Sequence, residues 1–282
     1  MSKIAVIGIA GESVFLSVDS FGLTGETTVA NSFFSELGGK GFNQAVASAR
    51  YGAEVSFLGA CNQEDKEKFS AIATARGVKS FFAGKKERSP YAVITTDKQG
   101  DNKVCVYRGA ELFVDDLACF VEEIKTADVL LINNETPIEV NEMAVKIAKA
   151  NGVKIILNPA PARAYSRAFL DEIDLFTPNE HETDGLENYQ NVVVTLGEKG
   201  CLIKNENALI PAEKVEQVVD TTGAGDTFNG VLVACIAHGD NMQTACKKAN
   251  IASAIKVTRK YILDSIPARE EIEKYEKEQQ NG

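Results

Sequence analysis

Short β-branched segments alternate with longer alanine-rich segments along most of this chain. Segments of apolar residues that predict buried strands are 3–10, 54–61, 128–133, 154–161, 174–179, 191–197 and 200–205. Segments with helical spacing of apolar residues are 41–52, 64–77, 114–126, 137–151, 225–238 and 242–257. Strands that alternate with helices are typical of a mostly parallel sheet covered by helices on both faces. The sequence therefore predicts an α/β fold, a three-layer αβα sandwich.

Two β-rich segments, at about 13–35 and 88–110, interrupt this alternation. The second has a turn sequence, "DKQGDN", between two strand-like runs, which predicts a hairpin. The charged last residues, "REEIEKYEKEQQNG", are typical of a solvated helix that frays. No linker or repeat separates these segments, so we expect one domain over residues 1–282 with a small accessory sheet inserted into it.

Composition excludes several classes of partner. The chain has 282 residues, with 30 basic and 40 acidic side chains and a formal net charge of −10. Nucleic-acid and membrane-surface binders carry a basic excess, so we expect neither partner. No apolar run is long enough to span a membrane, and the six scattered cysteines are typical of reduced thiols. These observations predict a cytoplasmic protein. Its two histidines, without metal-ligand spacing, are expected to be incidental.

A glycine-rich turn, "VVDTTGAGDTFNG" at residues 218–230, precedes a predicted helix. Bare backbone at a helix N-terminus offers N–H donors and partial positive charge to an anion. Asp226 lies in the first turn of that helix. It could simply cap the helix, because aspartate is common there. Alternatively, it could take the proton of a hydroxyl that attacks a phosphoryl group held by the turn.

A second glycine-rich turn, "ELGGKGFNQAVA" at residues 36–47, also precedes a predicted helix. Its glycines would let a ligand approach the backbone, Lys40 offers a cation, and Asn43 suits a polyol. The alternative is an ordinary strand–helix turn with a solvated lysine. The sequence has neither a G-x-x-x-x-G-K-[ST] phosphate loop nor a G-x-G-x-x-G dinucleotide motif after its first strand.

Together, the two turns resemble the signatures of the ribokinase-like (PfkB) carbohydrate kinases. The similarity extends over nearly the whole chain, through "LNPAPAR", "DLFTPNEHET", "VVVTLGEKG" and "ASAIKVTRK". The resemblance implies transfer of the ATP γ-phosphoryl group to a hydroxymethyl group of a sugar or sugar-like molecule. It also implies that the accessory β segments form a lid over the sugar and the contact of a homodimer.

The resemblance also implies site residues. Asp226 matches the catalytic base, and the anion hole is matched by Gly223, Ala224 and Gly225. Positions that match sugar contacts are Ser13, Gly38, Gly39, Lys40, Asn43 and Glu135. Positions that match the nucleotide site are Asn179, Thr195, Gly197, Gly200 and Asn250. Asn179 and Glu182 match a motif associated with Mg²⁺, and Asp220 and Thr222 match part of a monovalent-cation (K⁺) site.

Three departures affect these expectations. The family has N-x-D after its first strand, but this chain has Gly11 and Ser13, and a serine hydrogen-bonds sugar hydroxyls more weakly than a carboxylate. Tyr261 stands where ribokinases have glycine, near the cation and the nucleotide. The segment between "NEHE" and "VVV" lacks most of a helix. The acceptor thus stays open between a sugar and a nucleoside or other non-sugar alcohol. A non-catalytic nucleotide- or sugar-binding regulator is a further alternative.

Overall fold

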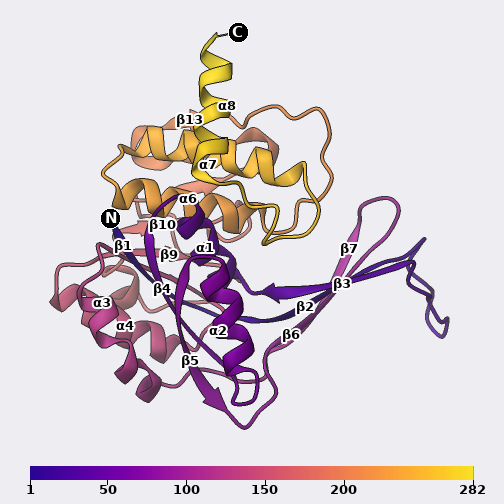
Figure 1. Ribbon diagram of the computed structural model, residues 1–282. Helices are drawn as coiled ribbons and strands as arrows, with labels where there is room; N and C mark the ends of the chain where they lie inside the picture. The colour runs from indigo at the N-terminus through magenta and orange to yellow at the C-terminus, as the bar shows by residue number, and fades with distance from the viewer. Residues whose placement is uncertain (282) are drawn as a thin grey trace.

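A six-stranded parallel sheet lies at the centre of the computed structural model, which describes residues 1–281 (Figure 1). Its strands, in spatial order, are β10 (Leu175–Phe176), β9 (Lys154–Asn158), β8 (Val129–Asn133), β1 (Lys3–Ile7), β4 (Glu54–Asn62) and β5 (Val78–Lys85). The predicted parallel sheet is confirmed. Strand β5 was not predicted, because it lies at the sheet edge and mixes exposed and buried side chains without a clear pattern.

Helices cover both faces of this sheet. One side carries α1 (Lys40–Arg50), α2 (Lys66–Ala75), α6 (Ala224–Ala237), α7 (Met242–Val257) and α8 (Arg269–Asn281). The other carries η1 (Val114–Cys119), α3 (Val121–Lys125), α4 (Ile138–Ala150) and the short α5 (Arg167–Leu170). The helix predicted over 114–126 is wrong in detail. It is a 3₁₀ turn and a short α-helix, separated by the fully buried Phe120, whose backbone leaves helical geometry.

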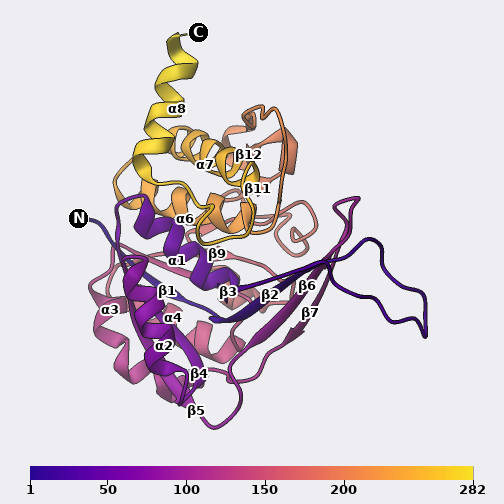
Figure 2. The ribbon, with the colours of Figure 1, turned by 45° about the vertical axis from the view of Figure 1, so that its right-hand side comes forward.

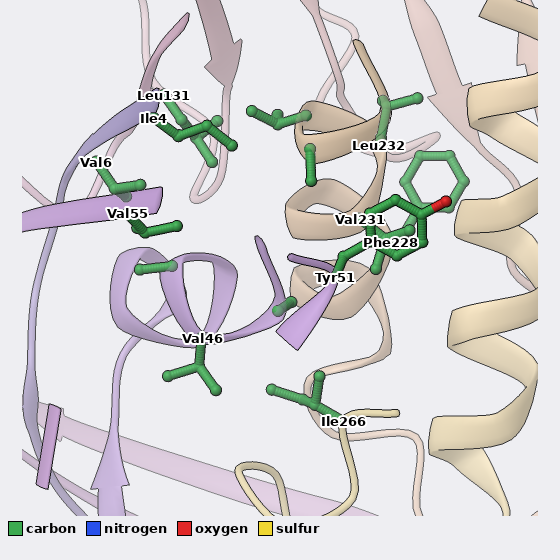
Figure 3. Packing of buried hydrophobic residues seen from close by; sticks show 14 of the residues in the cluster. Ile4, Val6, Val46, Tyr51, Val55, Leu131, Phe228, Val231, Leu232 and Ile266 are labelled. Carbon is green, nitrogen blue, oxygen red and sulfur yellow. The ribbon is translucent and has the colours of Figure 1, made fainter. Parts of the chain in front are cut away.

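Alternating side chains of the sheet supply two hydrophobic cores. Ile4 and Val6 of β1 pack on the side of α1 and α6, whereas Ala5 and Ile7 pack on the opposite side. Figure 3 shows the first core, where side chains of β1, α1 and α6 meet. Because a strand alternates its side chains between faces, a fully buried strand must be apolar throughout.

The interrupting segments form a second sheet, with the order β3-β2-β6-β7, which projects from the body in Figures 1 and 2. Its strands are β2 (Gly11–Ser17), β3 (Ser32–Gly38), β6 (Tyr91–Thr96) and β7 (Asn102–Tyr107). We call it the projecting sheet. The predicted hairpin is confirmed. The β-rich segment predicted at about 13–35 forms strands only in part, because residues 18–31 form an extended loop without strand pairing.

A third, antiparallel sheet is built from β11 (Val193–Thr195), β12 (Cys201–Ile203) and β13 (Ala208–Ile210). Two 3₁₀ turns, η2 (Gly197–Lys199) and η3 (Lys204–Glu206), connect these strands. The sequence predicts β11 and β12 but not β13. Across residues 1–281, no helix is both long and apolar enough to cross a bilayer. All six cysteines are free thiols, as predicted.

Candidate active site

The two glycine-rich turns meet beside the carboxyl end of β1. Gly41, in the first turn of α1, lies so close to Gly8 that a Cβ built on Gly41 would be 2.6 Å from the Gly8 Cα. Asn43 Nδ2, also on α1, donates a hydrogen bond of 2.8 Å to Asp226 Oδ2 on α6. The fold therefore brings together two motifs that are 183 residues apart in sequence.

Asp226 is held by two side-chain amides. Its Oδ2 accepts from Asn43, and its Oδ1 accepts from Gln44 Nε2 at 3.2 Å. The side chain is buried, at 8% exposure. Gly223 is the N-cap residue of α6, and no side chain of the described residues caps this helix end. The alternative of Asp226 as a helix cap is therefore wrong, and its carboxylate is oriented toward α1 instead.

The start of α6 offers open backbone. Gly223 adopts the left-handed conformation with φ 77°, and Thr227 N makes the helical bond to its carbonyl. The first N–H groups of a helix have no intrahelical acceptor, and the helix dipole makes this end positive. A Cβ built on Gly225 would meet nothing within 4 Å, so the space beside its backbone is empty of protein atoms. The turn can hold an anion next to the Asp226 carboxylate.

The start of α1 needs glycine for steric reasons. Gly39 has φ 119°, and a Cβ there would lie 2.2 Å from the Ile9 carbonyl oxygen. A Cβ on Gly38 would lie 2.5 Å from Ser13 Oγ, which places the Ser13 hydroxyl at this turn. Glycine is also required at position 11, on β2, because a Cβ there would lie 2.2 Å from the Pro90 carbonyl oxygen. The projecting sheet thus packs against the α1 turn with no room for larger residues at these positions.

A lysine and three carboxylates share the site. Burial raises the pKa of Glu135 to about 7, the charge of Asp226 adds to the rise, and the Lys40 ammonium opposes it. Asp226 and Glu135 together raise the pKa of Lys40 against the effect of burial, and Glu182 contributes as well. Glu135 Oε2 accepts from Gly41 N at 3.3 Å. Lys40 therefore stays charged among three acids, at the point where both turns meet.

Several uncharged polar residues at this site were not predicted. Gln44 Nε2 also donates to Asn158 Oδ1 at 2.9 Å, and Asn158 ends β9. Asn133 ends β8, and its Oδ1 accepts from Glu135 N at 2.9 Å. The available signal was an asparagine at the end of each of these two apolar strands, since the carboxyl ends of parallel strands share one edge of the sheet.

Buried polar atoms without a protein partner cluster near these residues. In the described part of the chain they include Asn43 Oδ1, Gln44 Oε1, Asn133 Nδ2 and Thr177 Oγ1. Buried polar groups are nearly always hydrogen-bonded, and leaving one unpaired costs about 1–3 kcal/mol. Both donors and acceptors are represented, which suits a polyhydroxylated ligand whose hydroxyls can both give and receive protons.

The predicted nucleotide residues lie on neighbouring loops. Thr195 ends β11 and bridges Asn179, and Gly200 closes the following turn with φ 97°. A Cβ on Gly200 would lie 2.1 Å from the Ile210 carbonyl oxygen, so this glycine serves the turn itself. Gly197 is also left-handed and has open space around it. Asn250, on α7, donates to the carbonyls of Ile210 and Pro211, each at 3.0 Å, which fixes the end of β13.

The predicted magnesium motif forms a compact turn. Asn179 N donates to Glu182 Oε2 at 3.1 Å, and Asn179 Oδ1 accepts from His181 N at 2.8 Å. Among the described residues, no three His, Cys, Asp or Glu side chains gather as a preformed metal cage. Mg²⁺ bound to a nucleotide keeps several waters and needs only one or two carboxylates. The donor set therefore fits a hydrated Mg²⁺ carried with the phosphates, beside Glu182.

The predicted monovalent-cation residues have internal partners. Asp220 Oδ1 accepts from Thr222 N at 2.8 Å, and Asp220 Oδ2 accepts from Tyr261 N at 3.0 Å. Tyr261 has φ 64°, which explains why glycine suits this position, and its ring stacks on Phe34 of β3 at 3.7 Å between centroids. The tyrosine thus joins this loop to the projecting sheet.

Comparison with known proteins identifies the family that the sequence motifs resemble. Residues 1–269 match the model of the pfkB family carbohydrate kinases. A ribokinase of Haemophilus influenzae is 34% identical over 295 residues, covering 95% of this chain and 96% of that protein. A ribokinase of Bacillus subtilis is 33% identical and covers 97% of this chain and 99% of its own.

Solved structures agree. The ribokinase of Thermotoga maritima superposes with a TM-score of 0.86 at 31% identity, covering 98% of this chain and 100% of that one. Arabidopsis thaliana ribokinase, solved with ribose and ATP, superposes with a TM-score of 0.82 at 27% identity, covering 97% and 98%. This chain belongs to the pfkB family of carbohydrate kinases.

Proposed function

We propose that this kinase transfers the γ-phosphoryl group of ATP to a hydroxymethyl group of a small sugar, with Asp226 as the general base. The observation that carries the proposal is the Asp226 carboxylate, fixed by Asn43 and Gln44 beside the open N-terminus of α6. A base must lie next to its nucleophile, and the donors must lie where phosphoryl charge spreads. This geometry supports both roles at one helix end.

The step then follows from the residues of this chain. The Asp226 carboxylate takes the hydroxyl proton as the sugar oxygen forms a bond to the γ-phosphorus. The bond from that phosphorus to the bridging oxygen breaks, and ADP leaves with the electron pair. The N–H groups of Gly223, Gly225 and Asp226 stabilise the charge on the transferring oxygens, whereas the Ala224 amide donates to the Thr221 carbonyl. Mg²⁺ bound with the nucleotide would neutralise phosphate charge, and we expect Glu182, which accepts from the Asn179 amide, to hold its waters.

For the acceptor, ribose is the first candidate. Curated relatives over at least 95% of the chain are named ribokinase, and others at 29% identity are named deoxyribokinase. The unpartnered donors and acceptors around Gln44 and Asn133 favour a polyol in this space. We expect the Ser13 hydroxyl to contact it, since Ser13 is buried and lies against the Gly38 turn.

One observation favours a second acceptor class. Gly11 cannot carry a side chain because of the Pro90 carbonyl, and Ser13 offers one hydroxyl where the family has a carboxylate. Two charge-assisted hydrogen bonds to a sugar are thus replaced by a weaker one. A nucleoside or another alcohol is therefore the alternative acceptor. The proposed reaction, phosphoryl transfer from ATP to a hydroxyl group, is the same for either acceptor.

We further propose that the projecting sheet joins two copies of the chain. Strand register places Val104 and Val106 of β7 on the same face as Ser13, across Ile94 and Ala92 of β6. Both valines are exposed, at 56% and 59%. A second copy that covers this face would bury them and exclude water from the acceptor side. Val106→Glu should give monomers by size-exclusion chromatography, whereas Lys103→Glu, on the opposite face of β7, should not.

The reaction is tested with a panel of pentoses, deoxypentoses, hexoses and nucleosides, in an assay that couples ADP release to NADH oxidation. Asp226→Asn should lower kcat for the best acceptor by about 10³-fold or more, because the base is lost, while binding of a non-hydrolysable ATP analogue changes little. The matched control, Asp101→Asn, removes the same charge from the exposed hairpin turn. Equal turnover of the two variants would refute the assignment of the base.

A further inference from the structure

A lysine lies fully buried behind the proposed phosphate turn. Lys256, in the last turn of α7, is 0% exposed. Lysine is almost never fully buried unless it is paired, because removing an ammonium from water is costly. Its position in the sequence, within "ASAIKVTRK", gave no sign of burial. A fully buried ammonium group therefore needs an explanation in terms of what its charge does.

The contact made by Lys256 identifies that function. Its Nζ donates to the backbone carbonyl of Asp220 at 2.7 Å. Asp220 is three residues before Gly223, the N-cap residue of α6. The amides of Val219 and Asp220 also donate to the carbonyl of Val257, at 2.7 and 3.1 Å. The segment before the phosphate turn is therefore fastened to the C-terminal end of α7, where a cation is favoured by the helix dipole.

Three acids lie near the ammonium. Burial lowers the pKa of Lys256, and the negative charges of Asp220, Glu36 and Asp226 oppose that shift. Glu36, on β3, accepts from the amides of Ile262 and Leu263 at 2.8 and 2.9 Å. Three acids and one internal cation thus surround the place where the turn before α6, the loop at 258–266 and the projecting sheet meet.

A bound K⁺ does not fit the Asp220 group. A monovalent cation is held by carbonyl and carboxylate oxygens, and Asp220 and Thr222 are the residues predicted to supply part of them. The Asp220 carbonyl accepts from Lys256, and the two Asp220 carboxylate oxygens accept from the amides of Thr222 and Tyr261. Every oxygen of Asp220 that could bind a cation already accepts a hydrogen bond from the chain itself.

We propose that the Lys256 ammonium replaces a bound monovalent cation, so that the enzyme is active without added K⁺. Lys256 is a positioning residue. It holds the backbone at 219–222, which sets the N–H groups of the phosphate turn, and it does not touch the substrate. The inference rests on the proposed phosphoryl transfer, and it makes this enzyme's cation independence a consequence of one side chain.

The first experiment uses the unmodified protein. Turnover is measured in K⁺ buffer and in buffer where tetramethylammonium, too large for such a site, replaces K⁺ and Na⁺. The expected result is the same kcat in both buffers. An increase of about tenfold or more on adding K⁺, the size of effect expected when a catalytic group is oriented by a bound ion, would overturn the proposal.

The second experiment removes the ammonium. Lys256→Ala should lower kcat about 10- to 100-fold in tetramethylammonium buffer, the range expected when an orienting group is lost. Added K⁺, NH₄⁺ or methylammonium should restore part of the loss, because each can enter the space that is left. A folded variant with full activity, or one that no small cation rescues, contradicts the proposal. Lys256→Met, which keeps the apolar stem, provides a second variant if Lys256→Ala does not fold.

The control removes a different lysine from the same helix. Lys248 is two turns earlier on α7 and pairs with Asp240 at 2.7 Å, so Lys248→Met should leave kcat and its cation response unchanged. If the chain phosphorylates none of the acceptors tested, thermal shift with a non-hydrolysable ATP analogue gives a separate measurement. Cation-dependent stabilisation of Lys256→Ala but not of the wild type would then support the inference while the proposed function fails.

Discussion

Glu135 should make the stability of this protein fall as pH rises from about 5 to 8. Burial raises its pKa to about 7 from the ordinary value of 4.5. A carboxyl group with a raised pKa in the folded state binds its proton more tightly there than in the unfolded chain. Its favourable contribution is complete below the unfolded pKa and disappears as pH rises through the folded pKa.

The magnitude follows from the two pKa values. Linkage gives a loss of about 2.5 kcal/mol in the free energy of unfolding between pH 5 and pH 8 from this group alone. Glu135→Gln removes the titration and keeps an acceptor for Gly41 N. The variant should therefore gain stability relative to the wild type by about this amount across the same range.

The assay is urea unfolding followed by far-UV circular dichroism, because the chain has no tryptophan. Glu271→Gln is the control of opposite sign, since a hydrogen bond from Arg259 lowers the pKa of Glu271. The Glu271→Gln substitution should therefore lower the free energy of unfolding most at pH 8 and least in acid. A stability difference between Glu135→Gln and the wild type that is constant from pH 5 to 8 would refute the assignment of a partly buried, proton-binding Glu135.

Four further predictions concern the turns and the loop that they contact. Gly223→Ala should destabilise the fold by about 1–3 kcal/mol in urea unfolding, because φ is 77° and the new Cβ would lie 2.8 Å from Ile262 Cγ2. Gly225→Ala should keep its stability and yet weaken binding of the ATP analogue, since its Cβ would enter open space at the phosphate turn; unchanged affinity would count against the turn as the phosphate site. Gln44→Ala should lower kcat about tenfold with little change in the KM for ATP, by freeing one oxygen of the proposed base. Glu36→Ala should loosen the loop at 261–263, which faster amide hydrogen exchange at Ile262 would reveal.

Much of the architecture was predictable because its signals are local. Apolar runs and helical spacing gave the order of strands and helices, and the "DKQGDN" turn gave the hairpin. Strand β5 and the break at Phe120 were missed, because the first is an edge strand with mixed exposure and the second depends on what a buried ring packs against. Local pattern does not report either of these tertiary contacts.

The site residues also divide into those that the sequence predicted and those that it did not. The two glycine turns and Asp226 were visible in the sequence, because a bare backbone before a helix needs glycine wherever it occurs. Gln44 was not, since its partner Asp226 is 182 residues away and the two meet only when α1 and α6 pack together.

The sequence by itself determined an α/β sandwich with two glycine turns, because strand alternation, helical spacing and glycine geometry depend on neighbouring residues. Only the tertiary structure decided which acid is oriented by amides, which carboxyl binds a proton near neutral pH, and which lysine is buried. These properties depend on the distance to distant charges and on exclusion from water. Both arise only when the sheet and its helices close around the site.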